Sequence, residues 1–336
     1  MDKPALGVSF EREIREQPTV WERLAESNKA VQLAEALDDD IVLVGSGSSL
    51  FAARLGALAL RRRAISAEAL AATEARLDHA AYENKTVVAI SQSGRSTDVL
   101  NALDVLKPSR LIALTNTAES PLGERADLTI DVAAGREVAV PATKSVTATL
   151  AILLWAASLL GKAGTREPSA LLSTAHTVRE WLDENADEEL AEPAHRISLR
   201  RHLVFLGSDY GFPIAQEVAL KFKEAAYIHA EGFAAGEFRH GSIAMVDASY
   251  AVIGIVDRDA LPMLEQPMQE VRRADALRYL IGRCEIDGVP RLGPTVEDPY
   301  NTLAWLVTAQ MLALHIARIA GIDSDRPRGL TKALTV

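Results

Sequence analysis

Short apolar runs followed by glycine- and serine-rich turns recur along the chain. The run from Ile41 to Val44 leads into a turn at Gly45 to Ser49, and the run from Thr86 to Ile90 leads into a turn at Ser91 to Gly94. A helix-like stretch follows each turn. Apolar, β-branched runs bounded by glycine and serine are typical of buried strands. Each segment therefore predicts a strand, a turn and a helix.

Similar runs lie at 111–114, 128–132, 203–206 and 250–256. Strands that alternate with helices favour an α/β fold whose parallel sheet is covered on both faces. Val42 and Val87 lie 45 residues apart, and Leu203 and Val252 lie 49 apart, which indicates a duplication. In the second half Asp257-Arg258-Asp259 takes the place of a serine turn. We therefore expect one half to bind ligand and the other to contribute catalytic groups.

Four segments follow from this pattern. We expect a helical segment at 1–37, interrupted at Gln17-Pro18, a first α/β domain at 38–165, a second at 190–320 and a tail at 321–336. The stretches 161–168 and 183–192 predict a connection along the surface with at least one helix. The uncharged run 145–161 is shorter than the roughly 20 apolar residues that span a bilayer, so we interpret it as a buried helix.

Charge and cysteine content narrow the class of protein. The 336 residues carry a net charge of −10, which argues against nucleic acid or an anionic membrane surface as the main partner. The single cysteine, Cys284, excludes an internal disulfide framework and a multi-cysteine metal site. The N-terminus has no apolar core of the kind that a secretory signal needs. We expect a cytoplasmic protein.

The densest group of acid and base side chains follows the run at 203–206. A helix is predicted after Pro213, and it carries Glu217, Lys221 and Glu224 on one face, at i, i+4 and i+7. The ordinary alternative is a solvated ladder of ion pairs. Because further acid and base groups follow in a glycine-rich segment that ends at Gly241, we favour a site of proton transfer.

The two serine turns predict an anion site without a lysine. Free backbone N–H groups at helix N-termini beyond the carboxyl ends of parallel strands favour an anion. Hydroxyl donors would stand at two such termini: Ser48, Ser49, Ser91, Ser93 and Ser96. Helix capping and turn formation are the alternative role for each turn alone. The first turn lacks the third glycine of a dinucleotide fingerprint and a P-loop lysine, so a nicotinamide dehydrogenase is disfavoured.

Histidines and one lysine complete the candidate chemistry. His229 and His240 stand among glycines and carboxylates, although most histidines have packing or surface roles. No third ligand accompanies His229 and Glu231 at a recurring zinc spacing, so we expect no metal, and a proton shuttle is the better interpretation of His240. Lys332 stands among the apolar residues of the tail. An apolar pocket would make it a nucleophile toward carbonyls.

Together these motifs resemble the sugar-isomerase (SIS) family, in particular the two-SIS isomerase part of glucosamine-6-phosphate synthase and stand-alone amino-sugar phosphate isomerases and deaminases. The resemblance covers almost the whole chain. It rests, in order, on segments 13–18 (Glu-Ile-Arg-Glu-Gln-Pro), 47–49, 91–94, 143–144, 219–224, 227–231, 236–241 and 323–328, and on Lys332. It implies two tandem flavodoxin-like domains, each a parallel-sheet αβα sandwich, with an N-terminal helical segment and a C-terminal tail docked on the site.

The resemblance also implies residue roles. Phosphate would be bound by Ser48, Ser91, Gln92, Ser93 and Ser96, with Ser49 close by, and the sugar would lie beside Val140 and Ala142. Glu224 would move a proton between C1 and C2 of an opened hexose phosphate, assisted by Lys221 and Glu217. His240 from the neighbouring subunit of a homodimer would open the ring, and Lys332 would lie at the sugar carbonyl. No cofactor is implied.

The chain departs from the synthase pattern at several positions. Arg95 replaces a glutamate, Pro141-Ala142 replaces Ala-Ser beside the sugar, and Ser46 replaces a cysteine. Asp2 follows Met1, where a glutaminase domain would begin with cysteine. Without glutamine-derived ammonia, we expect glucosamine-6-phosphate to be converted to fructose-6-phosphate and ammonia. The alternatives are an isomerase or deglycase of another substituted hexose 6-phosphate, and a non-catalytic phosphosugar sensor.

Overall fold

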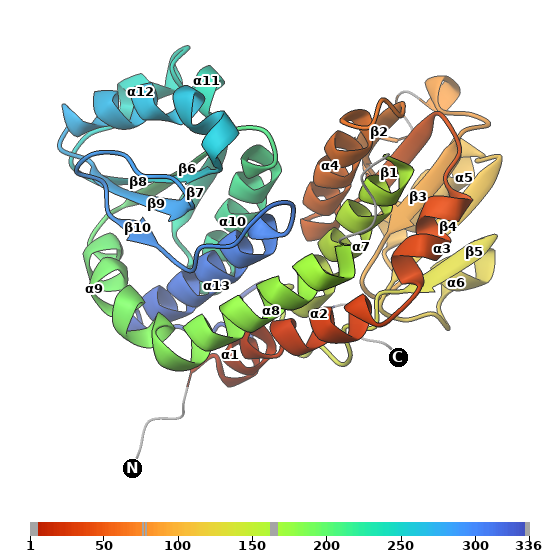
Figure 1. The fold of residues 1–336 in the computed structure, drawn as a ribbon, viewed down its shortest axis with the longest axis horizontal. Helices are drawn as coiled ribbons and strands as arrows, with labels where there is room; N and C mark the ends of the chain where they lie inside the picture. Colours follow the sequence, from red (N-terminus) through yellow and green to blue (C-terminus); the bar gives the residue numbers. More distant parts are fainter. Residues whose placement is uncertain (1–5, 76, 78, 162–166, 333–336) are drawn as a thin grey trace. The chain divides into compact units, whose positions relative to one another are not determined.

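The computed structural model describes residues 6–75, 77, 79–161 and 167–332 (Figure 1). Contacts between residues divide the chain into two compact units. We call them the first-sheet unit, comprising Thr19–Glu137, Lys144–Leu172 and Lys332–Val336, and the second-sheet unit, comprising Met1–Pro18, Val138–Thr143 and Ser173–Thr331. The segment boundaries expected from the sequence stay predictions.

The first-sheet unit alternates strands and helices. Its elements are α2 (Gln17–Ala25), α3 (Lys29–Ala36), β1 (Ile41–Gly45), α4 (Ser48–Arg61), β2 (Ala67–Ala71), η1 (His79–Ala81), β3 (Thr86–Ile90), α5 (Thr97–Leu106), β4 (Arg110–Thr115), α6 (Pro121–Arg125), β5 (Leu128–Asp131) and α7 (Lys144–Leu160). Helix α8 (Glu167–Glu184) begins in this unit and continues into the other.

The second-sheet unit follows the same plan. Its elements are α1 (Val8–Arg15), α9 (Ala186–Ser198), β6 (His202–Gly207), α10 (Gly211–Ala226), β7 (His229–Ala234), α11 (Ala235–Phe238), η2 (Ser242–Met245), β8 (Tyr250–Val256), η3 (Arg258–Ala260), α12 (Leu261–Arg272), β9 (Leu277–Gly282), β10 (Arg291–Leu292) and α13 (Asn301–Ile319).

Within the described residues each unit has one five-stranded parallel sheet. The strand orders are β2-β1-β3-β4-β5 and β10-β9-β8-β6-β7. In both sheets the first strand of the unit lies between the second and the third. After the second strand the chain therefore crosses to the other side of the first strand and adds the later strands there. The direction in which strands are added reverses at this point. This is the order of a flavodoxin-like sheet, and its ligand crevice opens at the reversal, beyond the strand carboxyl ends. The expected α/β fold and its duplication are confirmed.

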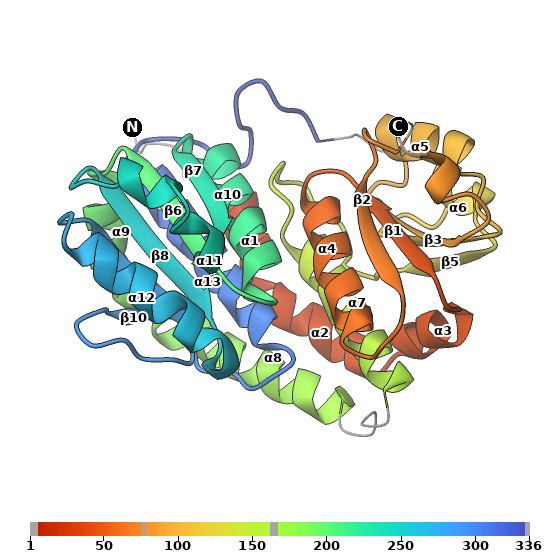
Figure 2. The same cartoon turned by 90° about the horizontal axis from the view of Figure 1, so that it is seen from above.

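Alternation along β1 separates two faces of the first sheet. Val42 and Val44 pack in a buried cluster with Val99 and Leu103 of α5. Leu43 points to the other face, where α4 and α7 pack against each other (Figure 2). Because successive strand residues face opposite sides, a fully apolar strand predicts helices on both faces.

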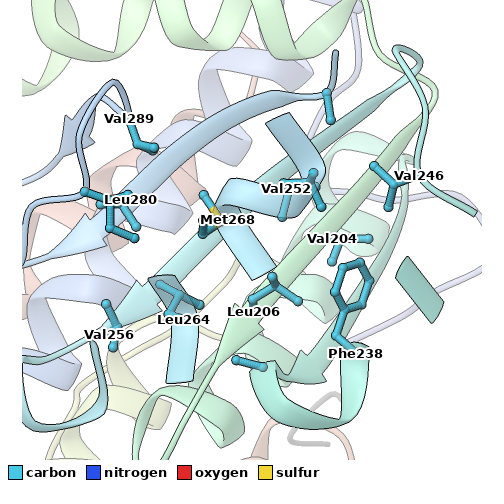
Figure 3. Packing of buried hydrophobic residues seen from close by; sticks show 14 of the residues in the cluster. Val204, Leu206, Phe238, Val246, Val252, Val256, Leu264, Met268, Leu280 and Val289 are labelled. Carbon is cyan, nitrogen blue, oxygen red and sulfur yellow. The ribbon is translucent and has the colours of Figure 1, made fainter. Parts of the chain in front are cut away.

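The second sheet is covered in the same way. Val204 and Leu206 of β6 pack with Leu264 and Met268 of α12 in a buried cluster (Figure 3). Phe205 faces the opposite side, where α10 covers the sheet and the Phe205 and Phe222 ring centroids are 5.0 Å apart. Burial of this aromatic pair fixes α10, the helix that carries the expected acid/base groups, against β6.

Some elements differ from the sequence expectation. The N-terminal segment forms three short helices, α1 to α3, rather than one interrupted helix. Helix α10 begins at Gly211, so Pro213 lies in its first turn, where the missing N–H costs no helical hydrogen bond. The connection expected around 161–168 lies partly outside the described residues, and 183–192 belongs to α8 and α9.

Helix α13 is long and apolar enough to cross a membrane by length and composition, but 83% of its most apolar window is buried inside the protein. It packs against α9 and α10 of its own unit. A helix that is apolar all round is typical of a buried core helix as well as of a membrane span. We therefore interpret α13 as the core helix of the second-sheet unit.

Candidate active site

The turn after β1 leads directly into the N-terminus of α4. Gly45 closes β1 so tightly on the first turn of α4 that a Cβ there would lie 2.6 Å from the Ser49 carbonyl carbon. Gly47 has a φ of 56° and is the N-cap of α4, and no side chain caps the helix at that position. Backbone carbonyls of the turn accept from the first N–H groups of α4: Ser49 donates to Ser46 at 3.1 Å and Leu50 to Gly47 at 3.0 Å.

The turn after β3 repeats this arrangement at the neighbouring strand. Ser91 and Ser93 are buried, and the Ser93 hydroxyl accepts a hydrogen bond from the Arg95 N–H at 3.2 Å. Gly94 has a φ of 62°, and an added side chain there would collide with Ser120. Ser96 is the N-cap of α5, but its side chain makes no capping bond.

These turns form what we call the serine cradle. Its members are Ser48, Ser49, Ser91, Gln92, Ser93 and Ser96. Within the described residues the side chains of Ser49, Ser91 and Ser96 make no hydrogen bond with the protein. Since β1 and β3 are adjacent and flank the chain reversal, the cradle lies at the carboxyl edge where open sheets bind ligands. Hydroxyls and helix termini there can hold an anion.

The expected face of acid and base groups on α10 is present, but it is not a solvated ladder. The Lys221 ammonium lies 3.5 Å from a Glu217 oxygen and 2.5 Å from Glu224 Oε2. Side chains of Glu217 and Lys221 are only 1% exposed, whereas that of Glu224 is 18% exposed. Surface ion pairs are common and weak, but buried charges need a function or a strong partner.

This line of charges can position a base. Lys221 is held by the buried Glu217 on one side and donates to Glu224 on the other. Glu224 keeps one edge accessible, so its carboxylate can meet a substrate while the lysine fixes its orientation. A positioned carboxylate can remove and return a proton on the same face of a molecule.

The two histidines lie in different places. His240 is exposed, in the turn that follows α11, and its backbone N–H donates to Glu237 at 3.0 Å. His229 begins β7 at the amino end of the sheet, where its Nδ1 lies 3.4 Å from Nδ1 of His202. Ligands of parallel sheets bind at the opposite edge. Among the described residues no group of three or more metal-ligating side chains could hold an ion.

The segment that carries Val140 and Ala142 is held by a buried glutamate. Glu13 of α1 accepts hydrogen bonds from the N–H groups of Val138, at 2.5 Å, and Ala139, at 3.2 Å. The N–H of Val140 donates to the Asp325 carbonyl at 3.3 Å. Sequence reasoning used Glu13 only as part of a motif. Its role in shaping this segment had no signal in the sequence, because the contact spans more than a hundred residues.

The C-terminal tail docks, as expected. Asp325 accepts from the N–H groups of Ser9 and Phe10 at the start of α1. Ser324 donates to the Ala225 carbonyl, next to Glu224, at 3.3 Å. Arg328 stacks over the ring of Tyr227, the C-cap of α10, at 4.6 Å. The tail is therefore fixed along the end of α10.

Lys332 has an ionic partner rather than the apolar pocket that the sequence suggested. Its ammonium lies 2.9 Å from Oε2 of Glu137, whose side chain is fully buried. Glu137 also accepts from the Ser145 hydroxyl at 2.8 Å and the Ser145 N–H at 3.1 Å. Ala333 and Leu334, the other apolar tail residues, lie outside the described residues. Glu137 is a candidate site residue that sequence reasoning missed.

The candidate residues fall into two groups. The first-sheet unit brings the serine cradle and Lys332 into one compact unit. The second-sheet unit contains the charged line of α10, His240, Val140 and Ala142. One unit thus offers an anion site, and the other offers a carboxylate base.

Known proteins match this organisation. A glutamine–fructose-6-phosphate aminotransferase (isomerizing) from Corynebacterium glutamicum is 33% identical over 371 aligned residues, which cover 100% of this chain and 59% of the relative. One from Sulfurisphaera tokodaii is 31% identical, over 97% of this chain and 56% of the relative. The chain therefore spans less than two thirds of the length of these curated relatives.

Solved structures are similar along nearly the whole chain. The C-terminal domain of glucosamine-fructose-6-phosphate aminotransferase from Francisella tularensis has a TM-score of 0.84 and 26% identity, and covers 97% of this chain and 100% of that domain. A glucosamine-6-phosphate deaminase from Thermotoga maritima has a TM-score of 0.79 and 26% identity, with coverage of 97% and 99%.

The family model for the SIS domain matches residues 36–159 and 196–291, one segment for each parallel sheet. These segments together make up more than half of the chain, and they contain both serine turns and the charged face of α10. The chain therefore belongs to the SIS domain family.

Proposed function

We propose that the chain is an amino-sugar phosphate isomerase/deaminase, which converts glucosamine-6-phosphate to fructose-6-phosphate and ammonia without a cofactor. The observation that carries this proposal is the line Glu217, Lys221 and Glu224, in which two groups are buried and the last carboxylate keeps an accessible edge. The similarity to a deaminase from Thermotoga maritima over 97% of this chain supports it.

The serine cradle would bind the phosphate group. His240 would open the sugar ring by moving a proton between the ring oxygen and O1. In the opened hexose phosphate, Lys332 would lie at the carbonyl. These roles match the side chains: hydroxyls and helix N–H groups suit a phosphate, an exposed imidazole suits proton exchange, and an ammonium suits a carbonyl oxygen.

Glu224 would then carry one proton between two carbons. It takes the proton from C2, and the C1 aldehyde oxygen gains a proton, which gives an enolamine. The protonated Glu224 returns the proton to C1, and the C2 amine becomes an imine. Water hydrolyses this imine to the ketone and ammonia. One carboxylate is enough because both carbons present the same face to it.

Lys221 and Glu217 would support this transfer without touching the substrate. The 2.5 Å contact from the Lys221 ammonium holds one Glu224 oxygen, so the other is presented in a fixed direction. Glu217 balances the charge of Lys221 inside the helix packing. Fixing the base in this way removes the entropy cost of orienting it during reaction.

Another substituted hexose 6-phosphate is the second candidate. Pro141 and Ala142 stand in the segment that would line the sugar, and neither side chain can donate a hydrogen bond to a sugar hydroxyl. A substrate that presents an apolar or larger substituent at C1 or C2 would suit such a lining. An isomerase or deglycase of that class uses the same phosphate site and the same base.

We propose a cytoplasmic homodimer in which His240 completes the site of the neighbouring subunit. His240 is exposed, and its side chain makes no hydrogen bond or ion pair within the described part of its own chain. If the dimer is required, specific activity falls on dilution below the dissociation constant. A monomer that stays fully active at nanomolar concentration would contradict the shared site.

A substrate panel tests the function. Purified protein is incubated with glucosamine-6-phosphate, its N-acetyl and galacto analogues and fructose-6-phosphate, and ammonia and ketose are measured. Ammonia from glucosamine-6-phosphate alone supports deamination of that sugar. Turnover of another member identifies the second candidate, and binding without any turnover over the panel would show a phosphosugar sensor.

A further inference from the structure

Two residues in the serine turns carry a buried side-chain atom that has no hydrogen-bond partner within the described part of the chain. Among the described residues of the first-sheet unit, the buried side-chain polar atoms without a hydrogen-bond partner are the Ser46 hydroxyl oxygen and the Arg95 Nε. Both residues lie in the turns of the serine cradle. Unpaired buried polar atoms are rare in native proteins, and each needs a physical reason.

The sheet register places these residues at neighbouring strand ends. Val44 of β1 pairs with Ala89 of β3. Ser46, two residues after Val44, is therefore level with Ser91, two residues after Ala89. Arg95 stands between Gly94 and the N-cap residue Ser96, immediately before α5. Ser46 and Arg95 thus border the serine cradle from two adjacent strands.

Arg95 has no counter-charge in the described part of the chain. Its backbone N–H donates to Ser93, but its guanidinium makes no hydrogen bond or ion pair there. A buried donor without an acceptor costs about 1–3 kcal/mol, and more when the group is charged. Arginines in such surroundings are usually paired with a carboxylate or a phosphate.

We propose that Arg95 and Ser46 complete the phosphate site of the cradle, with the Arg95 guanidinium as its positive charge and the Ser46 hydroxyl as an additional donor. This inference rests on the proposed phosphosugar function. Both residues are only partly buried, so a phosphate dianion in the cradle could supply the acceptor that the Ser46 hydroxyl and the Arg95 Nε lack. The guanidinium also makes the site selective for phosphorylated over unphosphorylated sugars, because neutral hydroxyls bind both classes.

A binding experiment tests this assignment without turnover. Isothermal titration measures the dissociation constants of inorganic phosphate and of fructose-6-phosphate for wild-type protein and variants. Arg95→Gln weakens both by about 10-fold to 100-fold, because a hydrogen-bonded charge pair is lost. Arg95→Glu weakens them further through repulsion. Ser46→Ala weakens them by about 3-fold to 10-fold.

Matched control variants distinguish the loss of the Arg95 charge from a loss of folding. Arg125→Gln removes an arginine of the same unit that is paired with Asp104 at the surface, and it leaves both constants unchanged. Arg95→Lys retains the charge and keeps binding within about 5-fold of wild type. If Arg95→Gln does not fold, the phosphate affinities of Arg95→Lys and Ser46→Ala test the assignment instead. Higher salt weakens phosphate binding more in the wild type than in Arg95→Gln.

The outcomes separate this inference from the proposed reaction. Unchanged phosphate affinity in folded Arg95→Gln overturns the inference, whatever the enzyme turns over. Phosphate binding that depends on Arg95, with no ammonia from glucosamine-6-phosphate, supports the inference and removes the proposed deamination. A wild-type protein that binds neither phosphate nor fructose-6-phosphate overturns both.

Discussion

The ammonium of Lys332 lies 2.9 Å from the Glu137 carboxylate, and these two residues are 195 positions apart in the chain. The same carboxylate accepts two hydrogen bonds from Ser145, in the first turn of α7. Through Glu137, Lys332 is thus anchored to the first turn of the helix that follows residues 138–143. A lysine held in this way presents its ammonium in a fixed position.

Glu137→Gln is expected to lower turnover through Lys332. In a double-mutant cycle, Glu137→Gln and Lys332→Ala each reduce kcat, and the double variant loses no more than Lys332→Ala alone. Removing the carboxylate also costs on the order of 2 kcal/mol of stability, which is seen as a lower urea midpoint. Asp104→Asn, which breaks a surface pair with Arg125 in the same unit, keeps wild-type kcat. Additive losses in the cycle would show that Glu137 acts independently of Lys332.

Lys221→Met is expected to destabilise the second-sheet unit strongly. It leaves Glu217, only 1% exposed, without the charge of Lys221, and breaking a buried pair costs about 3–5 kcal/mol. Replacing both residues in Glu217→Met/Lys221→Met recovers most of the loss, because no charge then stays buried. Urea unfolding measures the stability of the single variant and of the double variant. Lys223→Met, at an exposed position two residues away, serves as the control and changes the midpoint little.

Gly94→Ala is expected to damage the serine cradle. The position has a φ of 62°, and a Cβ there collides with Ser120. Gly135 has a φ of 73° but no atom within 4 Å of an added Cβ, so Gly135→Ala carries the same backbone strain without the collision. Thermal unfolding and phosphate titration should show a larger loss for Gly94→Ala in both properties. Equal losses would mean that the close approach of Ser120 is relieved by small shifts.

Stability is expected to fall as pH rises through neutrality because of Asp298. Asp298 is half-exposed, and the partial burial of its carboxyl, together with a hydrogen bond and repulsion from Asp257, raises the pKa of this group to about 7. Since the folded pKa exceeds the unfolded value of about 3.9, the native state binds the proton more tightly. This stabilisation is fully present below about pH 4 and is lost as the pH rises through about 7.

The variant Asp298→Asn tests the predicted direction of the pH dependence of stability. The amide resembles the protonated acid, so the variant keeps a donor toward Asp257 at every pH. Its melting temperature should match that of the wild type near about pH 4 and exceed it by roughly 1–2 °C near about pH 8.5. Arg283 and Asn301, the partners of Asp298, are not substituted in this comparison. A difference that does not vary with pH would contradict a raised pKa.

Local patterns predicted strands β1, β3, β4, β5, β6 and β8, whose runs contain β-branched residues, and the helix face of α10. They did not reveal β2 (Ala67–Ala71), whose sequence Ala-Glu-Ala-Leu-Ala has no β-branched residue. This strand exists because it pairs in parallel with β1 at the sheet edge. Similarly, the segment 229–234 was interpreted for its chemistry, yet it forms β7 beside β6.

The remaining contacts that the sequence did not predict join residues far apart in the chain. The charge pattern of α10 was readable because its members lie within two turns of one helix. Glu13 and Glu137, in contrast, meet their partners across more than a hundred residues. Only the folded chain brings such groups together, so the ionic partner of Lys332 could not be predicted. The unpaired guanidinium of Arg95 is likewise a property of the folded turn.

The central claim is that Glu224 carries the proton in the deamination of glucosamine-6-phosphate. The direct measurement is the rate of ammonia and fructose-6-phosphate formation by wild-type protein, Glu224→Gln and Glu231→Gln, an acid of the same segment that lies in β7. The account predicts turnover in the wild type and Glu231→Gln, and a loss of about 100-fold or more in folded Glu224→Gln. Full deamination by Glu224→Gln would contradict it.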